Sequence, residues 1–136
     1  MNEQAIPTLA RLLLAGIFVR AGVSHAMDLP GMQQAISAKG FPSELALVAA
    51  IAATIILLLG GTSLLLGLRV RWGAIALIIF LIPTTLLFHG NVLDSSEGTQ
   101  FLKNIGLIGG LLLLWYSGPG LLSIDGPRQR SWFGKW

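Results

Sequence analysis

The longest uncharged stretch of the sequence, residues 45–68, sets the strongest limit on how this chain can fold. It reads LALVAAIAATIILLLGGTSLLLGL, which is 24 consecutive residues without an ionisable side chain. A helix rises about 1.5 Å per residue, so this stretch can cross a hydrocarbon core of about 30 Å. Hydrophobic residues make up 54% of the whole chain and charged residues only 11%, which is unusual for a soluble domain. The sequence therefore predicts an integral membrane protein.

Three further apolar runs predict additional spans. Residues 72–88 form an uncharged run that contains Pro83, and residues 105–124 form another that we expect to break at Gly118. The first run is interrupted by Arg11 and Arg20, whose long side chains can extend toward opposite membrane interfaces. No basic cluster precedes it, so we expect a retained span and not a cleaved secretory signal. Re-entrant or interfacial packing of this run is the alternative.

These runs predict an all-α fold, a four-helix transmembrane bundle with up-down topology, in one domain that covers residues 1–136. The spans are expected at about residues 6–27, 45–68, 72–89 and 104–124, and residues 125–136 form a tail. Four spans place both termini and the loop between spans two and three on one side. That side carries most of the basic residues, so the positive-inside rule predicts cytoplasmic termini and a cytoplasmic tail. We expect Arg11→Leu to have little effect on ligand binding or activity, and Asp125 to pair weakly with the loop arginines.

The composition excludes several classes of function. The chain has no cysteine, which rules out disulfides, zinc–thiolate centres and iron–sulfur clusters. Its net charge of +3 comes from residues that lie between the apolar blocks and not in one patch. We therefore attribute the basic character to membrane topology and expect no nucleic acid as a partner.

Polar side chains from three predicted spans meet at the extracytoplasmic end of the expected bundle. An ionisable group within a membrane span is a candidate for function, because exposing it to lipid costs at least about 2.5 kcal/mol. The alternative is a set of separate headgroup anchors. The short connection between spans one and two could lie across this end as a lid. We expect the guanidinium of Arg20 to face the bundle interior and to reach toward His25, His89 and Asn104. The candidate ligand-binding residues are Arg20, His25, His89, Lys103 and Asn104.

Arginine and lysine donors beside neutral histidines suit an anionic or carbonyl-bearing ligand. A quinone headgroup or a small oxyanion fits this description. Haem or copper would need two facing imidazoles and is the less favoured alternative. The histidines form no recognisable nucleophile–base constellation with serine, threonine or an acid, which argues against hydrolytic catalysis. The sequence leaves open whether the protein is an enzyme.

Several short motifs, in order and at similar spacing, resemble the DoxX family of small membrane proteins. Each is weak alone, but together they span residues 9–125. They are Gly22 at the end of span one, the turn Gly40-Phe41-Pro42, Leu64-Leu65-Leu66-Gly67 followed by Arg69 and Arg71, Phe88-His89, Phe101-Leu102-Lys103-Asn104, Gly109-Gly110 and the closing GPGLLSID.

The resemblance implies a four-helix membrane bundle in a plasma (inner) membrane or an equivalent energy-transducing membrane. Some relatives are described as subunits of quinone-linked oxidoreductases, so it implies an accessory subunit of such a system, with other membrane subunits as partners. The alternative is a non-catalytic structural or assembly subunit. This chain departs from the family in having His25 where relatives often carry lysine, and in lacking an acid within residues 55–59.

Overall fold

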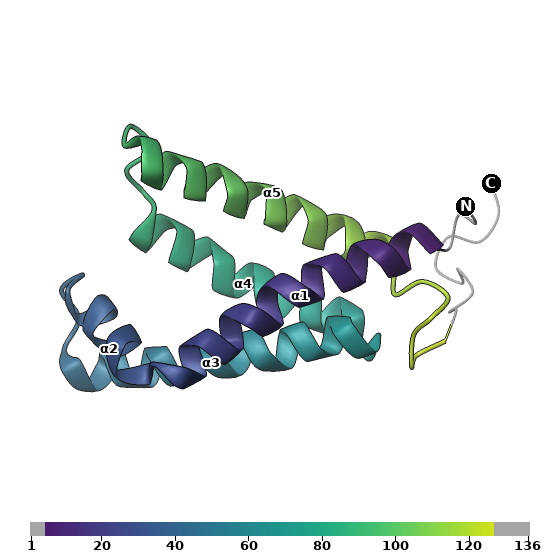
Figure 1. Cartoon of the computed structure of the whole chain (residues 1–136), viewed down its shortest axis with the longest axis horizontal. Coiled ribbons are helices and arrows are strands. Elements are labelled where there is room, and N and C mark those ends of the chain that lie inside the picture. The colour runs from purple at the N-terminus through teal and green to yellow at the C-terminus, as the bar shows by residue number, and fades with distance from the viewer. Residues whose placement is uncertain (1–4, 127–136) are drawn as a thin grey trace.

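The computed structural model of the chain describes residues 5–126, and within them the backbone forms five helices (Figure 1). The predicted tail at residues 125–136 lies outside the described residues from position 127 onward. The helices are α1 (Ala5–Met27), α2 (Leu29–Ser37), α3 (Ser43–Leu66), α4 (Val70–Phe88) and α5 (Ser95–Ser117).

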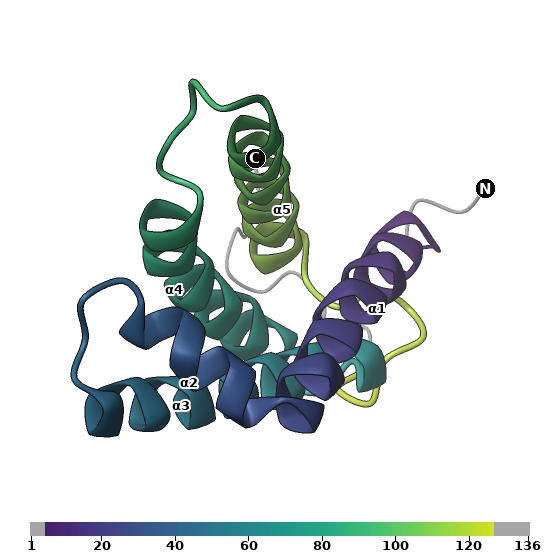
Figure 2. The ribbon, with the colours of Figure 1, turned by 60° about the vertical axis from the view of Figure 1, so that its left-hand side comes forward.

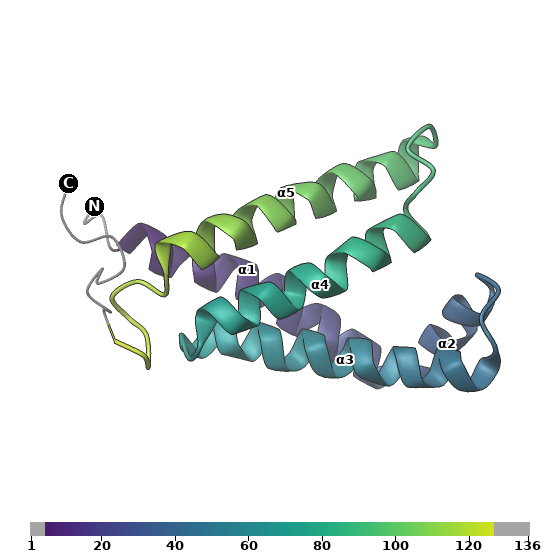
Figure 3. The ribbon, with the colours of Figure 1, turned by 180° about the vertical axis from the view of Figure 1, so that it is seen from behind.

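The four long helices pack mainly through α3 and α4. Helix α1 packs along α3, α3 packs on α4, and α4 packs on α5, whereas α1 and α5 meet only sparsely. Figures 1 and 3 show that α1 and α5 converge at the end where α1 begins and diverge toward α2. We call the first end the Arg11 end; it also contains the 67–69 turn and residues 118–126. We call the second end the α2 end; it contains α2 and residues 89–94.

The interior is a cluster of buried apolar side chains from all four long helices. Glycines on α1 and α3 allow the two backbones to approach closely: a Cβ added to Gly61 would lie 2.9 Å from the backbone nitrogen of Val19. The outer faces are also apolar, as the 68% exposure of Leu59 illustrates. Such a surface suits lipid. The cluster consists of Ala15, Phe18, Leu57, Leu64, Val70, Ala74, Leu77, Leu81, Leu111 and Leu114.

Helices α1, α3 and α4 are long and apolar enough to cross a membrane. They coincide with the first three predicted spans, and α4 continues through Pro83. The fourth helix differs from the prediction at 104–124, because α5 begins at Ser95 and ends at Ser117. Its start is set by Asp94, whose carboxylate accepts hydrogen bonds from the backbone N–H groups of the first turn. Among the described helices, α5 is long but not apolar enough to count as a candidate span by composition.

The connection between α1 and α3, which we expected could lie across the α2 end as a lid, forms helix α2. Helix α2 packs against α3 and leaves the space between α1 and α5 open (Figure 2). Asp28 caps α2 by accepting from the N–H of Gly31. Ile36 is buried against α3, and the Nζ of Lys39 lies 5.6 Å from the ring centroid of Phe88 at the end of α4. The helix is thus fastened to α3 and α4, and the space between α1 and α5 stays uncovered by it.

Arg11 holds the opposite end together, a structural role that the sequence pattern did not predict. Its side chain is only 1% exposed, and its guanidinium donates to the backbone carbonyls of Leu64 at 2.6 Å and Leu65 at 3.0 Å, and also to that of Leu122. The first two carbonyls belong to the last turn of α3, where the carbonyl of Leu64 also accepts from the backbone N–H of Gly67 at 3.3 Å. One side chain therefore joins α1, the end of α3 and the segment after α5.

The segment after α5 folds back onto the turn between α3 and α4. The N–H groups of Ile124 and Asp125 donate to the carbonyls of Leu66 and Gly67 at 3.2 and 3.1 Å. The carboxylate of Asp125 accepts from the backbone N–H of Arg69 at 2.5 Å. Asp125 thus contacts Arg69, but through the backbone N–H and not in the ion pair that we expected.

Candidate functional site

The sparse contact between α1 and α5 leaves a groove of about 440 Å³ on the side of the molecule where these helices diverge. On α1, its lining residues recur at intervals of three and four, which is one face of a helix. A Cβ added to Gly16 would meet nothing within 4 Å, so this position leaves the groove wide. The lining residues are Leu13, Gly16, Ile17 and Arg20 of α1 with Lys103 and Leu107 of α5.

The groove brings together two of the predicted site residues, Arg20 and Lys103. Both side chains are exposed, and within residues 5–126 neither has an ion-pair or hydrogen-bond partner. Arg20 precedes the end of α1 by seven residues and Lys103 follows the start of α5 by eight, so each lies about 10 Å along its helix from the α2 end. Two cations thus line one otherwise apolar groove at similar depth.

The position of Arg20 differs in one respect from what the sequence led us to expect. We expected its guanidinium to face the bundle interior and to reach toward His25, His89 and Asn104. It is instead an exposed residue on the groove face of α1. The reason is the direction of the helix face, because the buried face of α1 is the one that carries Arg11, Ala15 and Phe18.

Asn104 follows Lys103 but belongs to the interior. It is buried, and its Nδ2 donates to the hydroxyl oxygen of Thr85 on α4 at 3.0 Å. Sequence reasoning missed Thr85, although a threonine pair next to Pro83 in an apolar span is a visible signal of interhelical hydrogen bonding. The amide of Asn104 therefore joins α5 to α4.

The two histidines lie near the α2 end outside the groove lining. His25 is partly buried, and its Nδ1 is enclosed without a hydrogen-bond partner in the described chain. His89 caps the end of α4 and donates its backbone N–H to the carbonyl of Thr85 at 3.0 Å. Residues 5–126 contain no cluster of three or more histidine, aspartate or glutamate side chains of the kind that holds a metal ion.

Comparison with known proteins yields matches over most of the chain. The DoxX family model matches residues 6–90. The chain is 32% identical over 126 residues to "Inner membrane protein YqjF" of Escherichia coli (strain K12), covering 90% of this chain and 92% of that protein. It is 28% identical over 122 residues to "Inner membrane protein YphA" of the same organism, covering 86% of each chain. No solved structure matches the chain significantly.

Proposed function

This chain belongs to the DoxX family, and we propose that it is an accessory subunit of an oxidoreductase system in the inner membrane. In this role the α1–α5 groove binds the polar headgroup of an anionic or carbonyl-bearing amphiphile, with a quinone as the leading candidate. The observation that carries the proposal is that Arg20 and Lys103 line the same apolar groove without partners in residues 5–126.

The energetics of the groove favour a ligand of this class. A cation at membrane depth is costly unless it extends to water or meets an anion or a dipole. Arg20 and Lys103 offer only hydrogen-bond donors, so their best partner is an acceptor such as a quinone carbonyl or an oxyanion. The remaining lining consists of glycine and aliphatic side chains, which suit a ring or an isoprenoid tail. His25 and His89 lie outside the groove lining and Asn104 is bonded to Thr85 on α4, so the proposed contacts with the ligand are those of Arg20 and Lys103.

The proposed topology makes α5 the fourth span and both termini cytoplasmic. Two features support it. The 23 residues of α5 suffice in length to cross the hydrocarbon core, and the Arg11 end carries Arg69 and Arg71 in its short turn. This orientation puts the wide end of the α1–α5 groove toward the extracytoplasmic leaflet. Reporter fusions after Lys39 and Ser96 should then read extracytoplasmic, and a fusion after Arg69 should read cytoplasmic.

Binding of a short-chain quinone to the purified protein in lipid nanodiscs tests the function. Arg20→Gln and Lys103→Gln should each lower the affinity by about tenfold or more, because each removes a charged hydrogen-bond donor. The matched control is Lys39→Gln, which removes a cation at the same end but outside the groove. Unchanged affinity in both groove variants, or an equal loss in the control, would reject the groove as the binding site.

One observation favours a second candidate, a non-catalytic assembly subunit. A Cβ added to Gly106 or Gly109 of α5 would meet nothing within 4 Å, so this face is open to close approach by another helix. If a partner subunit co-purifies in stoichiometric amount with the Arg20→Gln and Lys103→Gln variants and no quinone binds to any form, the assembly role is the better description.

A further inference from the structure

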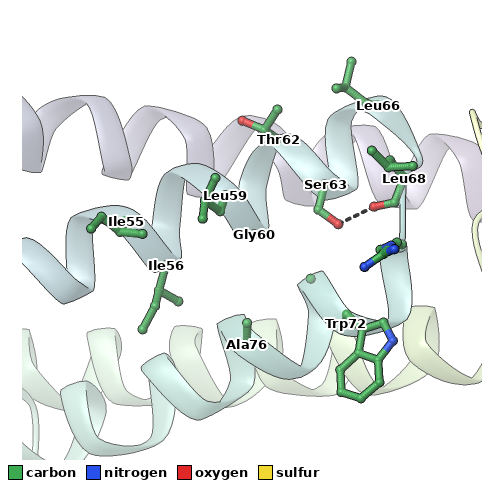
Figure 4. Close-up of a pocket in the computed structure, with 12 residues that line it drawn as sticks. Ile55, Ile56, Leu59, Gly60, Thr62, Ser63, Leu66, Leu68, Trp72 and Ala76 are labelled. Carbon is green, nitrogen blue, oxygen red and sulfur yellow. Dashed lines mark hydrogen bonds between the residues drawn. The ribbon is translucent and has the colours of Figure 1, made fainter.

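A second groove lies on the opposite side of the α3–α4 pair, and nothing in the proposed function uses it. It has a volume of about 420 Å³ and runs between α3 and α4 to the turn at the Arg11 end (Figure 4). In Figure 4, Ile56 of α3 and Ala76 of α4 extend into the space between the two helices, and Trp72 stands at its end beside the turn. Both helices are apolar enough to span the membrane, so this groove faces hydrocarbon.

Small residues make the groove shallow and its walls apolar. A Cβ added to Gly60 would lie 2.7 Å from Leu77 Cγ, and one added to Gly73 would lie 2.4 Å from Ser63 Oγ, so both helices need glycine here. Ser63 donates its hydroxyl to the carbonyl of Leu68 at 2.6 Å, which removes that donor from the groove surface. The floor therefore offers little for a polar ligand to bind.

Charge is confined to the end of the groove that reaches the turn. Arg69 lines the groove there, is exposed, and within residues 5–126 has no ion-pair partner for its guanidinium. Asp125 is near, but its carboxylate accepts from the backbone N–H of Arg69. Trp72 is 72% exposed beside it, and tryptophan favours the level of the lipid headgroups. The groove thus presents a cation and an indole at the interface, and below them a mainly apolar surface in which Thr62 and Ser63 are the hydroxyl side chains.

The length of the groove matches one lipid chain in one leaflet. Its lining on α3 extends from Leu66 back to Ile55, which is about 17 Å along the helix. Half of a hydrocarbon core is about 15 Å. We propose that this groove is a binding site for an anionic phospholipid, with the phosphate at Arg69 and one acyl chain along residues 55–66. Basic pockets between helices at the cytoplasmic side bind anionic headgroups in this manner.

Fluorescence quenching of Trp72 by brominated lipid tests the site directly. Trp115, Trp132 and Trp136 are replaced by phenylalanine, and the protein is placed in phosphatidylcholine vesicles with rising fractions of brominated phosphatidylglycerol. Parallel vesicles carry brominated phosphatidylcholine with the same acyl chains. The relative binding constant obtained from quenching should favour the anionic lipid about fivefold, as expected for one basic residue at the membrane surface.

Variants separate the headgroup contact from the acyl-chain contact. Arg69→Asn removes the charge with a residue that tolerates the left-handed backbone at this position (φ 48°) and should abolish the preference. Arg71→Asn, an exposed neighbour outside the lining, is the matched control and should retain it. Ala76→Leu fills the groove and should reduce quenching by both lipids. Circular dichroism confirms that each variant is folded.

Three results would overturn the proposal. The first is equal quenching by the two brominated lipids, which would indicate ordinary lipid contact. The second is competition by inorganic phosphate alone at millimolar concentration, which would indicate a free-anion site without a role for the acyl chain. The third is protection of Trp72 from both lipids together with crosslinking between two chains at Ala76→Cys, which would identify a second copy as the occupant.

Discussion

Removing the guanidinium of Arg11 should destabilise the protein by about 2–4.5 kcal/mol. Arg11→Met keeps the length of the side chain but removes the three guanidinium hydrogen bonds to the carbonyls of Leu64, Leu65 and Leu122, of which Leu64 keeps only the backbone N–H of Gly67. Three hydrogen bonds at the mean value for membrane proteins, about 0.6 kcal/mol each, sum to about 2 kcal/mol. At about 1.5 kcal/mol each, as for charged donors, they sum to more than 4 kcal/mol. The larger value is favoured because Arg11 is only 1% exposed, so water cannot easily replace it.

The free energy of unfolding is measured in mixed micelles with a rising fraction of sodium dodecyl sulfate and followed by circular dichroism. Arg11→Lys should restore only part of the stability, because a single ammonium group cannot reproduce the planar fork of the guanidinium. Arg71→Met removes an exposed arginine at the same end and should change stability by less than about 0.5 kcal/mol. Hydrogen exchange should accelerate at the amides of Ile124 and Asp125 in Arg11→Met. A loss below about 1 kcal/mol, or unchanged exchange at these amides, would refute the assigned role.

Three other contacts make further predictions. A double-mutant cycle with Asn104→Leu and Thr85→Val should give a coupling energy of about 0.5–1.7 kcal/mol in the same unfolding assay, and an additive result would contradict the buried hydrogen bond. Asp125→Ala should lower stability by about 1 kcal/mol whereas Asp125→Asn, which keeps an acceptor oxygen, should lower it less; equal losses would rule out the acceptor role. Gly61→Ala should cost about 1–3 kcal/mol because its Cβ would overlap α1, whereas Gly106→Ala, with open space around it, should be neutral or stabilising.

The spans at α3 and α4 were predictable because apolarity alone decides them. The predicted range 45–68 became Ser43–Leu66, and 72–89 became Val70–Phe88. The small shifts come from local backbone chemistry, such as the left-handed conformation of Gly67 (φ 70°) that ends α3. Helix α5 was harder, because its polar first turns are held in the helix by Asp94 and by tertiary packing on α4, neither of which an apolarity count detects.

The candidate site was predictable in depth along each helix but not in direction around it. Lys103 and Asn104 are neighbours in the chain, yet one lines the groove and the other is buried against α4. A helix turns about 100° per residue, so adjacent residues face different neighbours. Helix α1 is apolar on nearly all sides, which hides its buried face in the sequence. The buried positions do recur at helical spacing, but only Thr8, Ala15 and Gly22 among them are small, so the sequence marks this face weakly; the buried residues are Thr8, Arg11, Ala15, Phe18 and Gly22.

The two arginines of α1 show why direction matters for function. Nine residues separate Arg11 from Arg20, and nine steps of about 100° place them about 180° apart around the helix. Once Arg11 is fixed on the α3 face by its three carbonyl partners, Arg20 must face away from α3. On that side it meets the groove shared with α5, where Lys103 also lies. The structural arginine therefore determines where the second arginine points, and the cationic groove is a consequence of how the Arg11 end is fastened.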